Sequence, residues 1–143
     1  MRRTRTRALT LAAAVLVAAV ALTGCNAAQA NESVQRINEA RDAQGLPPLQ
    51  VEDGLARKAQ AWADRLAASG SLGHSSLTAD VPGGWSYLAE NVGSASSIAE
   101  MHALYMASPP HRANILDRRS NRVGVGVAEG GGRVYVVQEF GAY

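Results

Sequence analysis

The sequence predicts an α+β domain in which helices pack on a small antiparallel sheet. Segments with helical spacing of apolar residues come first, and a glycine-rich hairpin follows at the end of the chain. The length of 143 residues suits one domain, and a hydrophobic fraction of 47% is enough for a buried core. A single cysteine excludes an intramolecular disulfide and any Cys-rich zinc module.

Residues 1–24 have the pattern of an export signal. Four arginines lie within residues 2–7, and a run that is apolar except for one threonine follows at 8–22. That length is typical of the hydrophobic region of a secretory signal and is short for a membrane span. The motif Leu22-Thr23-Gly24-Cys25 resembles a bacterial lipobox, in which the cysteine is acylated and becomes the new N-terminus. The alternative is ordinary cleavage after Ala28-Gln29-Ala30, which would release a secreted protein.

We therefore expect a signal peptide at 1–24, a lipidated tether at 25–31 and one domain at 32–143. The protein would be a monomer on the extracytoplasmic face of a bacterial cell membrane, with Cys25 as its lipid anchor. Without residues 1–24, ten basic side chains remain against twelve acidic ones. This balance removes the electrostatic basis for binding nucleic acid.

Helices are expected at 32–44, 52–69, 95–107 and 110–117. Gly45 ends the first, and the following Pro47-Pro48 cannot continue a helix. Gly70 is the expected C-cap of the second. The inward face of this second helix is expected to carry Leu55, Ala59, Trp62 and Leu66.

The strands are expected at 86–92 and in a C-terminal hairpin. Val123, Val125 and Val127 alternate with glycines that let another element approach closely, and a glycine-rich turn at 129–132 leads into the last strand. Gln138 and Glu139 lie on opposite faces of that last strand, and the sequence leaves open which one faces a functional site.

Three residues could carry chemistry: His74, Glu90 and His111. Two neutral imidazoles and one carboxylate can supply three zinc ligands and leave a fourth position open to water. Alternatively, the carboxylate reaches a metal-bound water, or it hydrogen-bonds an imidazole and fixes its tautomer. Each residue also has a purely structural alternative. His74 would be an exposed loop residue, Glu90 would cap backbone N–H groups and His111 would be a residue at a helix start. His102 is interpreted as a packed histidine and Asn114 as a structural hydrogen-bonding residue.

The order of five motifs resembles the CAP superfamily, which comprises cysteine-rich secretory proteins, antigen five and pathogenesis-related proteins. The motifs, which span most of residues 33–141, are GHS, AENVG, SPPHRANIL, VGVGVA and YVVQEFG. The resemblance implies a three-layer α-β-α sandwich with a central antiparallel sheet. It also implies two histidines and two acids around a solvent-facing cleft, which binds zinc in some members. His74, His111 and Glu90 match three of these positions, whereas Ser108 stands where the second acid is expected.

The lipobox-like motif and the resemblance together lead us to expect a membrane-anchored lipoprotein whose cleft binds a lipid or a cell-envelope component without catalysis. His74 and His111 would be the ligands of a divalent metal, Zn²⁺. The alternative is a metal-assisted hydrolase of envelope peptides or glycans, in which Glu90 activates water. A further alternative is a structural interaction module with a vestigial cleft. No serine, cysteine or threonine nucleophile lies in a recognisable motif, which favours a role without catalysis.

Overall fold

The computed structural model describes the backbone of residues 6–143 and the side chains from residue 24 onward. The predicted signal peptide therefore lies largely outside the described side chains. No helix within this described part is long and apolar enough to cross a membrane. The elements, in chain order, are α1 (Thr6–Asp42), β1 (Gln50–Val51), α2 (Asp53–Ser69), β2 (Tyr87–Ala95), α3 (Ile98–Ala107), α4 (Pro109–Ile115), β3 (Arg122–Gly130) and β4 (Arg133–Ala142).

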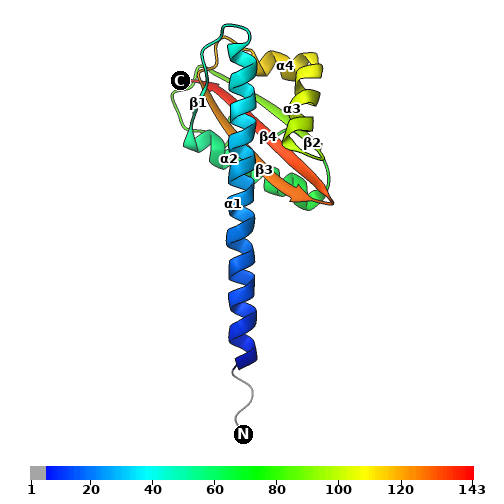
Figure 1. The fold of residues 1–143 in the computed structure, drawn as a ribbon. Coiled ribbons are helices and arrows are strands. Elements are labelled where there is room, and N and C mark those ends of the chain that lie inside the picture. The colour runs from blue at the N-terminus through cyan, green and yellow to red at the C-terminus, as the bar shows by residue number, and fades with distance from the viewer. Residues whose placement is uncertain (1–5) are drawn as a thin grey trace.

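The strands form one sheet in the order β1-β3-β4-β2 (Figure 1). β4 pairs antiparallel with both β2 and β3, which confirms the C-terminal hairpin. The sheet is mixed rather than purely antiparallel, because β1 pairs parallel with β3 through Gln50 and Arg122. A two-residue strand is too short to show any alternation of apolar and polar residues, so the sequence pattern could not indicate it.

Helices cover both faces of the sheet, which confirms the α-β-α sandwich. On one face, Ile37 of α1, Tyr105 of α3 and Ile115 of α4 pack against Val125 and Phe140 of the sheet. On the other face, α2 packs a separate cluster against the sheet, made of Ala59, Ala63, Leu66, Val92, Ala128, Tyr135 and Val137. Residues 71–86 connect α2 to β2 and carry His74.

The ends of α2 agree with the prediction. The carboxylate of Glu52 caps the helix by accepting a hydrogen bond from the Leu55 backbone at 2.6 Å, and Gly70 ends it with a left-handed φ of 67°. The expected inward face is right for Leu55, Ala59 and Leu66. Trp62 is only half-buried, and Ala63 takes the inward position beside it.

α1 extends much further than the predicted helix at 32–44, because it includes the expected tether at 25–31. Its N-terminal part projects away from the sheet (Figure 1). Its C-terminal end is fixed by the buried side chain of Arg41. The guanidinium donates to the carbonyl oxygens of Pro47 at 2.9 Å, Ile115 at 3.0 Å and Asp117 at 2.9 Å. These bonds tie the turn after α1 to the loop after α4.

Candidate functional site

The structure brings His74 and Glu90 into direct contact. The Nδ1 atom of His74 lies 2.7 Å from Oε1 of Glu90. The imidazole is 66% exposed, whereas the carboxylate on β2 is 1% exposed. A carboxylate acceptor places the ring proton on Nδ1 and leaves the lone pair of Nε2 directed away from this bond. The contact therefore presents a surface imidazole in the tautomer that can bind a metal or accept a proton through Nε2.

Ser75 donates to both carboxylate oxygens of Glu90. Its backbone N–H donates to Oε1 at 2.9 Å, and its hydroxyl donates to Oε2 at 2.5 Å. Burial alone would raise the pKa of Glu90, but the hydrogen bonds from Ser75, Glu139 and His74 outweigh it and lower the pKa. Glu90 is thus an ionised acceptor whose two oxygens hold the His74 loop. This arrangement favours fixing of the His74 tautomer over activation of water.

His111 lies at the beginning of α4 and is half-buried. Its Nδ1 atom lies 2.9 Å from the hydroxyl of Ser108, and its ring centroid is 5.1 Å from that of Tyr105. Burial lowers the pKa of His111, and the charge of a protonated His74 lowers it further. The neutral ring is therefore favoured, and the two histidines are near enough to influence each other electrostatically.

Asn91 fixes α4 to the edge strand β2. Its side-chain amide donates to the carbonyl oxygen of His111 at 3.1 Å and its side-chain oxygen accepts from Asn114 at 2.9 Å. Asn114 also donates to the backbone carbonyl of Glu90 at 3.3 Å. These bonds connect the segments that carry Glu90 and His111, and they confirm the structural interpretation of Asn114.

The structure resolves the choice that the sequence left open between Gln138 and Glu139, and it places a second buried carboxyl group beside Glu90. Glu139 of β4 is the direct register partner of Glu90 and is fully buried. Its Oε1 atom lies 3.1 Å from Nζ of Lys58 on α2 and 3.3 Å from the Ser75 hydroxyl. Gln138 faces the opposite side, where it donates to Ser33 at 3.1 Å. Strand alternation separates these two residues, but only the register of β4 shows that Glu139 is the one beside Glu90.

Glu90 and Glu139 share roughly one negative charge at neutral pH. Burial, followed by the hydrogen bond and the negative charge of Glu90, raises the pKa of Glu139 to about 8. The other oxygen of Glu139, Oε2, is buried without a hydrogen-bond partner, a position that a neutral acid tolerates better than an anion. The positive charge of Lys58 balances the remaining charge, so these three buried groups are close to neutral together.

An apolar cavity of about 260 Å³ adjoins His111. Leu72, Met101, Leu104 and Tyr105 form most of its apolar wall, and His111 lines it with them. Leu72 and Leu104 are 56% and 48% exposed, so apolar surface is accessible to solvent here. The cavity is suited to a small apolar group or the end of an acyl chain.

The Nδ1 atoms of His74 and His111 both lie within hydrogen-bond distance of a partner, so Nε2 is the ring atom that each could offer to a metal. Nε2 of His74 is directed away from its bond to Glu90, while both oxygens of Glu90 already accept hydrogen bonds. Within the residues that the structure describes, no three His, Cys, Asp or Glu side chains form a group suited to a metal ion. A metal at His74 and His111 would therefore take its remaining ligands from water or from a bound molecule.

Comparisons with solved structures give the same fold. An extracellular protein with an SCP domain from Bacillus anthracis is 20% identical with a TM-score of 0.75, covering 85% of this chain and 43% of that chain. A cysteine-rich secretory protein from Staphylococcus aureus is 24% identical with a TM-score of 0.68, covering 82% and 40%. An outer surface protein from Borrelia burgdorferi is 18% identical with a TM-score of 0.67, covering 76% and 88%.

The chain spans less than half the length of the first two of these proteins and most of the third. None of the curated proteins searched is a significant match. The model of the cysteine-rich secretory protein family matches residues 34–140, which include His74, Glu90, His111 and Glu139. This match covers most of the chain and includes every element from β1 to β3. The chain belongs to the cysteine-rich secretory protein family, also called the CAP family.

Proposed function

We propose that this protein is an exported, lipid-anchored CAP-domain protein that binds an apolar ligand from the membrane or cell envelope without catalysis. The observation that carries the proposal is the apolar cavity that adjoins the neutral imidazole of His111. The exposed side chains of Leu72 and Leu104 add accessible apolar surface of the kind that marks ligand grooves. Two structurally similar bacterial proteins, one extracellular and one an outer surface protein, support a location outside the cytoplasm.

Titration with a fluorescent fatty acid tests ligand binding. The purified full-length protein should bind the probe saturably, and Leu104→Ser should weaken binding about tenfold, because roughly 1.5 kcal/mol of apolar contact is lost. Leu77→Ser is the matched control, since Leu77 is also partly exposed but lies outside this cavity. Equal affinity in the wild type and Leu104→Ser would contradict binding at this cavity.

A divalent metal at His74 and His111 is a second part of this proposal. It is supported by the neutral state of His111 and by the fixed tautomer of His74. When bound, the metal would supply an electrophile for a polar head group of the ligand, while Glu90 keeps His74 oriented. Addition of zinc should shift the ring NMR resonances of both histidines and leave those of His102 unchanged. Unshifted resonances at His74 or at His111 would contradict the two-histidine site.

The anchor is proposed at Cys25. This cysteine is exposed on α1, and the residues that pack against the core, such as Ala30 and Val34, follow it along the helix. An acyl chain at this position would leave the cleft free of the membrane attachment. In bacteria that produce the full chain, Cys25→Ser should move the protein from the membrane fraction to the soluble extracytoplasmic fraction. Retention of the variant in the membrane would refute acylation at Cys25.

A further inference from the structure

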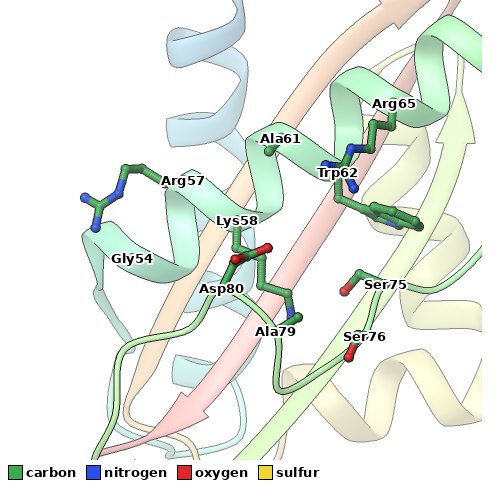
Figure 2. A pocket seen from close by; sticks show the side chains of 10 residues that line it. All are labelled: Gly54, Arg57, Lys58, Ala61, Trp62, Arg65, Ser75, Ser76, Ala79 and Asp80. Carbon is green, nitrogen blue, oxygen red and sulfur yellow. The ribbon is translucent and has the colours of Figure 1, made fainter.

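We propose a second binding site, for a small sugar phosphate, in the pocket between α2 and the loop at 75–80. The pocket has a volume of about 390 Å³, within the range of small-molecule sites in proteins. It shares no lining residue with the cavity beside His111, although Ser75, which lines it, also donates to Glu90. Figure 2 shows the pocket with α2 on one side and the loop on the other.

The charge of this pocket favours an anion. Two arginines of α2, Arg57 and Arg65, line it against one acidic residue, Asp80. The third basic residue, Lys58, is already neutralised by the buried carboxyl groups of Glu90 and Glu139. This local positive charge contrasts with residues 25–143 as a whole, in which acidic side chains outnumber basic ones. Arg57 and Arg65 lie toward the two ends of the pocket, with Lys58 between them (Figure 2). A phosphate that enters here meets a positive potential along the helix.

Arg65 is the residue best placed to bind the phosphate directly. Its guanidinium carbon lies 5.7 Å from the centroid of the Trp62 ring, which supports the planar group over an aromatic surface. Within the described part of the chain it forms no ion pair, so its donors remain available for a bidentate contact with phosphate oxygens. Lys58 is already bonded to Glu139 and to the carbonyl of Leu77, so it is not available for a contact with the phosphate.

The remaining lining residues suit the sugar. The indole N–H of Trp62 donates to the carbonyl of Gly73 at 2.9 Å, which holds the ring in place as an apolar wall for the C–H face of a sugar. Ser76 and the exposed carboxylate of Asp80 can hydrogen-bond sugar hydroxyls. A bare phosphate ion would leave most of the volume to water, since one water takes about 30 Å³. The pocket therefore favours the ester over the free ion.

NMR titration of the ¹⁵N-labelled full-length protein with glucose 6-phosphate tests this site. The indole N–H signal of Trp62, identified by its loss in Trp62→Phe, should shift saturably. Arg65→Gln should raise the Kd at least tenfold, because a charged hydrogen-bonding partner of the phosphate is lost. Arg118→Gln, at an exposed arginine outside the pocket, is the matched control and should leave the Kd unchanged.

Two further ligands separate the phosphate from the sugar. Inorganic phosphate and glucose should each bind more weakly than glucose 6-phosphate, and equal affinity for inorganic phosphate would overturn the assignment to a sugar ester. Absence of a saturable Trp62 shift, or an unchanged Kd in Arg65→Gln with an otherwise intact amide spectrum, would overturn the site itself. The wild-type Kd should also rise with added sodium chloride, a readout that needs no variant.

Discussion

At the scale of single residues, the site depends on two buried carboxyl groups that carry different charges. Glu90 accepts hydrogen bonds from His74 and Ser75 and is ionised, while Glu139 beside it is more deeply buried and keeps its proton near neutral pH. Two like charges this close in an apolar interior repel each other strongly, so one of them stays neutral. Glu139 therefore allows the Glu90 carboxylate to remain in place under the His74 loop.

The raised pKa of Glu139 makes stability depend on pH. A carboxyl group whose pKa is raised by folding stabilises the folded state fully when the pH is below its ordinary pKa of 4.5. This contribution is lost as the pH rises through about 8. Glu139→Gln mimics the neutral acid. Between pH 5 and 9 we expect the free energy of unfolding of the wild type to fall by about 2–4 kcal/mol relative to that of Glu139→Gln.

Urea denaturation at pH 5, 7 and 9 measures this difference. The lowered pKa of Glu90 acts in the opposite sense, because its stabilising contribution is lost only as the pH falls below the ordinary carboxyl range. Above pH 5, the difference between the wild type and Glu139→Gln therefore reports on Glu139, because the half-buried histidines titrate in both proteins. Glu129→Gln, at an exposed glutamate, is the matched control and should follow the wild type. Parallel curves for wild type and Glu139→Gln would show that Glu139 is already ionised at pH 5.

At the scale of elements, the site is held by the close approach of α2 to the sheet. A Cβ atom at Gly124 would lie 2.2 Å from the backbone of Ala56, and one at Gly126 would lie 2.2 Å from that of Ala59. Only glycine leaves room for the helix backbone at these positions. This contact sets the distance from α2 to β4, and so brings Lys58 within reach of Glu139.

Gly126→Ala tests that contact. The added methyl group would overlap the backbone of α2, so we expect the free energy of unfolding to fall by about 3 kcal/mol. Gly83→Ala is the matched control, because no heavy atom lies within 4 Å of its Cβ position and the backbone is not left-handed. Urea unfolding should place that variant within about 0.5 kcal/mol of the wild type. A similarly small effect of Gly126→Ala would contradict the tight packing of α2 on β3.

The elements that the sequence predicts well are those with local signals. The cap of α2 at Gly70 and the alternation in the last hairpin depend on a few neighbouring residues, and both are confirmed. The short strand β1 was missed because it exists only through its pairing with Arg122 and Val123. The helix predicted at 95–107 begins at Ile98 instead, since β2 continues to Ala95 and Ser97 is the N-cap.

At the scale of the whole molecule, the topology brings three distant segments to one edge of the sheet. The loop after α2 supplies His74, the edge strand β2 supplies Glu90 and the start of α4 supplies His111. The sequence identified these residue types and their motifs. It contained no signal for Lys58 and left open whether Gln138 or Glu139 faces the site. The contact of Lys58 with Glu139 depends on the packing of α2 and on the register of β4.

Histidine-ring NMR of the full-length protein tests most directly the claim that Glu90 presents His74 through its Nδ1–H. In the neutral ring, His74 should carry its proton on Nδ1 and show an unprotonated Nε2. Glu90→Gln should change this tautomer balance, while His102 should be unaffected. An Nε2-protonated His74 in the wild type would contradict the account, because the bond to the buried carboxylate could not then exist.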